Sequence, residues 1–219
     1  MCWRVLQEGT NEAKGFSRHH VASEVLEVLP GLPIYIGQSL EEAATVIAQG
    51  DAGSITVLAA LASPGSSLKR HLETVVRPWL YQHARRALGN QRLLLGVHDG
   101  DLQSQLALVD IVEQALPAFW EPATSTWEAR REAMLDLLGK AQPFAFKPAL
   151  QISPEAKLLI EALSGRWDYQ QDRREKKNIF YYVANAFSLL VSSLQWNGGK
   201  DEEIKSINNW DYERNMPSR

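Results

Sequence analysis

The sequence contains a single cysteine, Cys2, among its 219 residues. One cysteine forms neither an intrachain disulfide nor a zinc site of several thiolates, so a disulfide-stapled secreted fold is excluded. Long apolar runs are also lacking: 55–62 and 187–191 are among the longest, and a membrane-spanning helix needs roughly 20 residues. Residues 1–30 carry charged and histidine side chains in place of a signal-peptide core. These absences predict a cytoplasmic protein that does not enter a membrane.

The chain also lacks a basic excess. It has 23 Lys and Arg residues against 26 Asp and Glu residues, which gives a formal net charge of −3 and a pI near 6.0. Proteins that coat nucleic acid nonspecifically usually carry a strong positive charge, so this class is disfavoured, although local basic patches remain compatible. What is present is the balance of a globular protein, with 45% hydrophobic and 22% charged residues.

Short apolar segments alternate with amphipathic ones over the first 118 residues. The strands expected from this pattern are 2–6, 32–36, 54–62 and 92–97. The helices expected between and after them begin at Ser17 and at the capping box of Ser39 and Glu42, and continue with 68–88, kinked at Pro78, and 106–116. Such alternation predicts an α/β fold, a small mostly parallel sheet with flanking helices.

The pattern changes near residue 118, where prolines and a newly capped helix follow the last expected element. We therefore expect two parts, an α/β domain at 1–118 and an α-helical C-terminal extension at 119–219 that ends in a polar tail. The segment from Phe180 to Trp196 carries apolar side chains around much of its helical circumference. A helix of this kind is either deeply buried or pairs with another protein.

Three carboxylates follow expected strands. Glu8 comes after strand 2–6, and Asp99 and Asp101 flank Gly100 after strand 92–97. The carboxyl ends of parallel strands meet at one edge of a sheet, where α/β folds place their sites. Mg²⁺ binds one or two carboxylates and leaves its other positions to water and phosphate, so the arrangement predicts a magnesium site. The alternative is that Asp99 only ends a strand and Asp101 caps the next helix.

The segments VLQEGTNE at 5–12 and LGVHDGD at 95–101 resemble the two signature segments of the TOPRIM domain. That family has a glutamate-glycine turn after its first strand and an Asp-x-Asp pair after a later one. The resemblance implies that Glu8 acts as general acid or base and that Asp99 and Asp101 hold Mg²⁺. It departs from the family pattern at Gln7, where an apolar residue is usual, and in the extra strand and helix that separate the segments.

A second candidate site is the turn Ser63–Ser67, between an expected buried strand and a helix. Free N–H groups and the helix dipole at a helix start favour an anion, to which Lys69 and Arg70 would add positive charge. Ser66, Ser67, Lys69 and Arg70 are therefore predicted to contact a phosphate group of a cofactor or of nucleic acid. The alternative is an ordinary capped turn followed by a solvated basic helix face.

Two functions follow from these features. The first is a Mg²⁺-dependent, TOPRIM-like enzyme that acts on the phosphodiester bonds of nucleic acid. The second is a noncatalytic α/β subunit or regulatory module, whose protein partner or second copy binds through Phe180 to Trp196. The enzyme requires its carboxylates to cluster at the sheet edge, whereas the binding module requires an exposed apolar patch in the C-terminal region.

Overall fold

The computed structural model describes residues 16–40, 43–51, 54–88, 93–99, 106–123, 125–139, 149–166 and 178–197. The expected strand at 2–6 and two predicted site residues, Glu8 and Asp101, lie outside these ranges. No helix in the described ranges is long and apolar enough to cross a membrane.

Six strands form one sheet in the order β5-β4-β1-β2-β3-β6. Their bounds are β1 (Ile34–Ser39), β2 (Ala44–Asp51), β3 (Ser54–Ala62), β4 (Leu94–His98), β5 (Phe119–Pro122) and β6 (Leu150–Ile152). The pairs β1–β4, β4–β5 and β3–β6 are parallel, whereas β2 runs antiparallel to both of its neighbours, β1 and β3. The prediction of an α/β fold with a mostly parallel sheet is thus confirmed.

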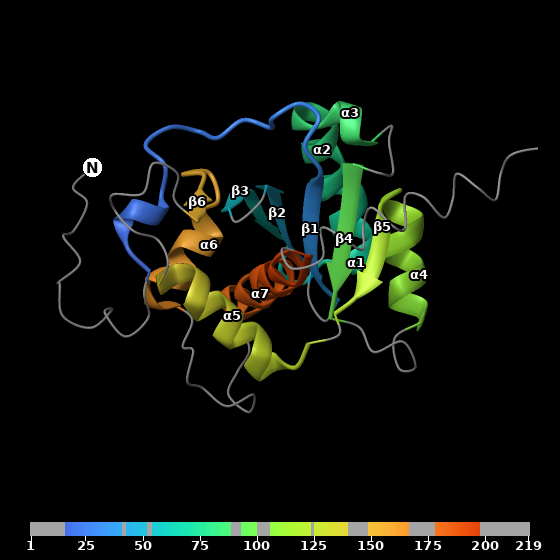
Figure 1. Cartoon of the computed structure of the whole chain (residues 1–219). Coiled ribbons are helices and arrows are strands. Elements are labelled where there is room, and N and C mark those ends of the chain that lie inside the picture. Colours follow the sequence, from blue (N-terminus) through green and yellow to red (C-terminus); the bar gives the residue numbers. More distant parts are fainter. Residues whose placement is uncertain are drawn as a thin grey trace, which may run out of the picture.

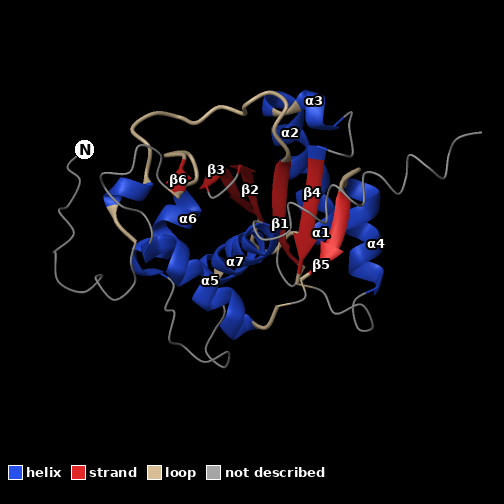
Figure 2. Ribbon diagram, viewed as in Figure 1, coloured by secondary structure: helices blue, strands red, loops and turns tan. Residues whose placement is uncertain are grey.

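Helices cover both faces of this sheet (Figure 1, Figure 2). One face carries α1 (Leu68–His71), the π-helical turn η3 (Leu72–Val76), α2 (Arg77–His83) and α4 (Leu106–Ala115), with α3 (Arg85–Leu88) following α2. The other face carries α5 (Trp127–Gly139), α6 (Lys157–Glu161), the π-helical turn η5 (Ala162–Arg166) and α7 (Ile179–Asn197). Helix α7 crosses this second face against β1 and β2.

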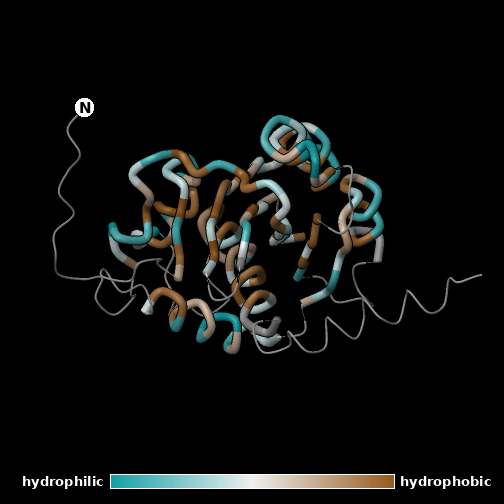
Figure 3. Tube along the Cα trace, turned by 45° about the horizontal axis from the view of Figure 1, so that its top comes forward, coloured by the Kyte–Doolittle hydropathy of each residue, from teal (hydrophilic) through white to brown (hydrophobic). Residues whose placement is uncertain are grey.

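Two hydrophobic clusters, one on each face, form the core. Neighbouring strand residues alternate between them: Ile36 of β1 and Ile47 of β2 pack under α1, α2 and α4, whereas Val46 and Ala48 pack under α7. Figure 3 shows hydrophobic stretches along the strands and along the helices that cover them. The central strands are therefore buried from both sides, as is typical of α/β sheets.

Several expected elements are confirmed and two are wrong. Strands β1, β3 and β4, the helical segment 68–88 and helix α4 lie where the pattern predicts them. The helix expected after Ser39 is instead strand β2, in which Thr45, Val46 and Ile47 are all fully buried. β-Branched residues favour strands, and pairing with two neighbours outweighs the local capping signal.

The helix expected from Ser17 is limited to the 3₁₀ turn η2 (Arg18–His20), and an extended segment follows it. This segment is held in place by hydrogen bonds to residues that are distant in the sequence. Gln49 accepts a hydrogen bond from the N–H of Leu29 (2.7 Å) and donates to the carbonyl oxygens of Leu29 and Leu32, while the N–H of Ala22 donates to Ile152. Tertiary hydrogen bonds therefore replace the helical ones.

The region after residue 118 adds two strands to the sheet as well as helices. β5 pairs with β4 at one edge, and β6 pairs with β3 at the other. The division into 1–118 and 119–219 stays a prediction about folding units. The segment expected to be a partner-binding surface is helix α7, whose residues from Val183 to Val191 are almost fully buried in the protein's own core. Of the two alternatives for this helix, the structure favours burial.

Candidate functional site

The candidate site lies at the edge where β1, β3 and β4 end and β2 begins. Since β2 is antiparallel to both β1 and β3, these two strands run in the same direction, and β4 runs parallel to β1. Their carboxyl ends therefore share one edge, as the sequence pattern predicts. Two groups of polar side chains occupy this edge, and successive β1 residues, Gln38 and Ser39, belong to opposite faces of the sheet.

The first group, which we call the Asp99 cluster, consists of Ser39, Asp99 and Asn185. Ser39 Oγ donates a hydrogen bond to Asp99 Oδ2 (3.1 Å), the N–H of Leu40 donates to Oδ1 (2.8 Å), and Asn185 Nδ2 donates to Oδ2 (2.6 Å). Ser39 and Asn185 are buried, whereas Asp99 is half-buried. The cluster thus joins the ends of β1 and β4 to helix α7, and Asp99 is its one charged member.

The second group, the His71 cluster, lies on the opposite face and consists of Gln38, Thr45, Ser63 and His71. Gln38 Nε2 donates to the carbonyl oxygens of Ser39 (2.7 Å) and Ala44 (3.0 Å), which turns its Oε1 toward Thr45. Thr45 Oγ1 donates to this Oε1 (2.5 Å) and lies 2.9 Å from Nε2 of His71. Nε2 must therefore carry the ring proton, and Nδ1 accepts from Ser63 Oγ at 2.8 Å.

Both histidines of this edge are held in the neutral form. His71 is fully buried, and this burial lowers its pKa from 6.5 to about 4. Burial also lowers the pKa of His98, against the opposing effect of Asp99 and Glu113. A neutral His71 that is oriented by uncharged partners has the features of a satisfied core histidine, and its basicity is well below that of an efficient general base at neutral pH.

The depressed pKa of His71 predicts that the protein loses stability on acidification. Above pH 6.5 the imidazole is neutral in both states. As the pH falls from 6.5 to 4, the unfolded chain binds a proton that the folded chain does not, so the free energy of unfolding falls by up to about 3 kcal/mol.

Urea unfolding at about pH 7.5 and about pH 4.5 measures this loss, and His71→Gln is expected to reduce it. His98 titrates in the same direction, so the comparison is made with His98 present in both proteins. An acid-induced loss of the same size in His71→Gln would contradict the assignment to His71.

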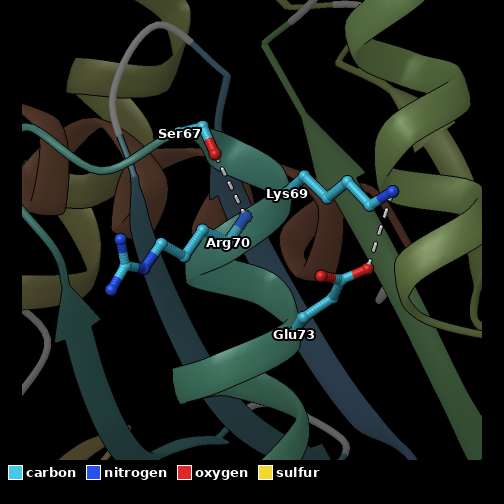
Figure 4. A network of polar contacts seen from close by, with 4 residues as sticks. All are labelled: Ser67, Lys69, Arg70 and Glu73. Atoms are coloured by element: carbon cyan, nitrogen blue, oxygen red, sulfur yellow. Dashed lines mark hydrogen bonds and ion pairs between the residues drawn. The ribbon is translucent and has the colours of Figure 1, made fainter.

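The residues of the second candidate site, Ser66, Ser67, Lys69 and Arg70, lie at the start of α1 and are not part of the Asp99 cluster. Ser67 caps the start of α1 by accepting a hydrogen bond from the N–H of Arg70 (3.3 Å), and Lys69 forms an exposed ion pair with Glu73 (3.9 Å). Figure 4 shows the side chains of Lys69 and Arg70 pointing away from each other. The contacts of this turn are those of a capped helix start, and phosphate binding by Ser66, Ser67, Lys69 and Arg70 stays a prediction.

Sequence reasoning identified Asp99 but missed the two side chains that meet it. Asn185 is a polar residue within the long apolar segment of α7, and Ser39 ends a strand that is otherwise apolar except for Gln38. A buried amide in such a helix requires a partner, which is the one signal that could have marked it. The sequence around Asn185 does not identify this partner, because Asp99 lies 86 residues away from Asn185.

The described residues include no group of three or more His, Cys, Asp or Glu side chains that could hold a metal ion. The Asp99 cluster offers a cation one carboxylate, the hydroxyl of Ser39 and the amide oxygen of Asn185. This Oδ1 atom is buried and accepts no hydrogen bond from the part of the chain that the structure describes. All of these are hard oxygen atoms of the kind that Mg²⁺ and Mn²⁺ bind, and Asp99 is the one carboxylate that the described residues bring to this cluster.

Comparison with known proteins rests on structure, because no protein-family model and no curated protein sequence matches the chain. The large terminase of a thermophilic bacteriophage superimposes with a TM-score of 0.60 and 11% sequence identity, over 84% of this chain and 45% of that protein. The nuclease domain of the bacteriophage SPP1 large terminase, crystallised with bound Mn, gives a TM-score of 0.52 and 15% identity, over 80% of this chain and 96% of that domain.

The chain thus spans less than half the length of the thermophilic phage terminase and nearly all of the isolated SPP1 domain. No family model supports the TOPRIM resemblance. At these identities the likeness concerns the fold alone. The described residues of the chain therefore have the fold seen in large-terminase nuclease domains.

Proposed function

We propose that this chain is a metal-dependent domain that acts on the phosphodiester bonds of nucleic acid, with Asp99 as a metal ligand. The observation that carries the proposal is the position of Asp99. It directly follows β4 at the edge where β1, β4 and α7 meet, in a fold shared with a nuclease domain that was crystallised with Mn. Sites of α/β folds form at this edge, because strand ends leave backbone and side chains free there.

The proposal assigns the remaining chemistry by position in the sequence. Asp101 follows Asp99 by two residues and would share the metal, and Glu8 would act as general acid or base, as the TOPRIM resemblance implies. A divalent cation at such a site stabilises negative charge on the phosphate and lowers the pKa of a bound water. The exposed basic residues of α1 to α3, such as Lys69, Arg70 and Arg85, would add attraction for the backbone.

A second candidate is a noncatalytic domain that binds nucleic acid without cleaving it. It is favoured by the hydrogen bonds of Asp99, whose two oxygens accept from three donors. A carboxylate that already satisfies three donors has less capacity left for a metal ion. The same experiment decides between the two candidates.

The test is cleavage of single- and double-stranded DNA and RNA by the purified chain in Mg²⁺ or Mn²⁺. The enzyme is expected to cleave at least one of these, and Asp99→Asn is expected to lower the rate by about 100-fold or more. Asp110→Asn is the matched control, because Asp110 is exposed on α4 and lies outside the Asp99 cluster. Asp101→Asn tests the second assigned ligand.

A thermal melt shows whether each variant is folded. Metal-independent binding of nucleic acid, with no cleavage by the folded wild type, would decide for the noncatalytic candidate. Loss of cleavage in Asp110→Asn as large as in Asp99→Asn would also overturn the assignment, because the effect would then not be specific to the site.

A further inference from the structure

Helices α2 and α3 carry positive charge without a balancing carboxylate. Between Glu73 and Asp99 the sequence contains no aspartate or glutamate, although the whole chain has 26 of them and a net charge of −3. The same stretch includes Arg77, Arg85 and Arg86, and all three are exposed. No ion pair joins these arginines to a carboxylate of the described residues. Positive charge is therefore concentrated here, on a chain that is acidic as a whole.

Tyr81 lies between these arginines. It follows Arg77 by four residues on α2, so the two side chains are neighbours on one face of the helix. The guanidinium carbon of Arg85 stands 4.8 Å from the centroid of the Tyr81 ring. A flat ring has two faces, and Tyr81 is 57% exposed, so the face away from Arg85 is accessible to a ligand. We call Arg77, Tyr81, Arg85 and Arg86 the α2–α3 surface.

The charge of helix α1, which precedes this surface, is offset by carboxylates. Lys69 of α1 pairs with Glu73 (3.9 Å), and α4, which carries the exposed Asp110 and Glu113, packs against α1 and η3. Helices α2 and α3 themselves contain no carboxylate. The α2–α3 surface is therefore a better site for a polyanion than the start of α1 is.

The α2–α3 surface is separate from the Asp99 cluster. Helix α3 leads into the start of β4, whereas Asp99 directly follows the end of β4, and Figure 1 shows α2 and α3 at the end of the sheet opposite to the arrowhead of β4. A strand of this length spans roughly 15 Å. A ligand that contacts both places must therefore be a chain molecule and not a single phosphate.

We propose that the α2–α3 surface binds single-stranded nucleic acid, with phosphates on its three arginines and an unpaired base stacked on Tyr81. The inference takes nucleic acid as the ligand from the proposed function, but it requires neither a metal ion nor cleavage. Arginines without a carboxylate partner attract a phosphate backbone of any sequence. An aromatic ring stacks on a base only where the face of the base is free, as it is in a single strand. The combination therefore favours single strands over duplexes.

The test is binding of a fluorescently labelled oligothymidine of about 20 nucleotides, and of a duplex of the same length, to the full chain in EDTA, measured by anisotropy. The wild type is expected to bind the single strand about tenfold more tightly than the duplex. Tyr81→Ala is expected to raise the Kd for the single strand by about tenfold, because the stacked base is lost, and to leave the Kd for the duplex unchanged.

The arginines are tested by the salt dependence of binding. Arg85→Gln and Arg86→Gln are each expected to raise the Kd and to reduce the slope of log Kd against log salt by about 0.7, since one phosphate contact is lost. Arg18→Gln is the matched control, because Arg18 is exposed on η2, which packs against β6 at the other edge of the sheet. Its Kd and slope are expected to match those of the wild type.

Two further variants isolate the ring of Tyr81. Tyr81→Phe keeps the ring and is expected to bind as the wild type does, whereas Tyr81→Gln keeps a long side chain without a ring and is expected to bind as Tyr81→Ala does. Thermal melts show whether each variant is folded. Equal single-strand affinity of the wild type and the variants without a ring, or no binding by the wild type, would overturn the inference. Weaker binding in the arginine variants alone would indicate a general polyanion surface and would overturn it as well.

These outcomes separate the inference from the proposed function. Binding in EDTA that depends on Tyr81, without cleavage of any nucleic acid in Mg²⁺ or Mn²⁺, supports the inference and overturns the enzymatic proposal. Cleavage that needs Asp99, together with unchanged single-strand affinity in Tyr81→Ala, supports the enzyme and overturns the role of the α2–α3 surface.

Discussion

Gly37→Ala is expected to destabilise the protein by about 1–3 kcal/mol and to lower Tm by roughly 5 °C. Gly37 lies on β1 under helix α7, and a Cβ atom there would overlap the carbonyl oxygen of Ala186 and lie 2.9 Å from Cγ of Leu190. The overlap is with backbone, which cannot rotate away, so α7 must shift. Because Asn185 directly precedes Ala186, the shift would also separate Asn185 from Asp99.

Differential scanning calorimetry measures the first effect, and Mn²⁺ titration measures the second. Gly139→Ala is the matched control, since a Cβ atom at the end of α5 meets no atom of the described residues within 4 Å. It is expected to leave Tm unchanged or slightly higher, because alanine favours a helix over glycine. A Gly37→Ala protein as stable as the Gly139→Ala protein would show that α7 does not approach the sheet so closely.

Phe187→Ala is expected to have the larger effect on stability, about 3–5 kcal/mol, with a fall in Tm of about 10 °C. The relative accessibility of Phe187 is 0%, and it is among the largest fully buried side chains. It packs in the cluster between the sheet and α5, α6 and α7, where a truncation leaves a cavity. Urea unfolding at neutral pH gives the free energy directly.

The control for Phe187 is another phenylalanine in an exposed place. Phe119 of β5 is 59% exposed, so Phe119→Ala removes little buried surface and is expected to cost far less. If both substitutions have the same small effect, α7 is not part of the folded core. In that case, its apolar residues would be free to bind a partner, as the sequence-based alternative for Phe180 to Trp196 holds.

The His71 and Asp99 clusters show how a sheet edge can be polar in the middle of an apolar fold. Gln38 and Ser39 are neighbours in β1, yet their side chains serve opposite faces of the sheet. Gln38 also donates to the carbonyl oxygen of Ser39, so β1 links the two clusters through its backbone. A substitution in the His71 cluster can therefore shift Ser39 and, through it, Asp99.

The sequence alone determined the class of this fold and one member of its candidate site. Apolar runs and turn residues located β1, β3, β4, the helix after Ser67 and α4. A strand that is buried on both faces has a continuous apolar run, which can be recognised from the sequence alone. The position of Asp99 followed from the same reasoning, since the residue after a buried strand must lie at a sheet edge. These statements need only neighbours within a few residues.

Tertiary structure decided the rest. Residues 39–47 carry a helix-capping signal, but Thr45, Val46 and Ile47 are buried in a strand because β1 and β3 lie on either side to pair with it. Ser39 and Asn185 joined Asp99 across 60 and 86 residues of sequence. The packing of whole helices and strands determines which side chains come into contact. A local sequence pattern can predict that a side chain is buried, but it does not identify the side chain that it contacts.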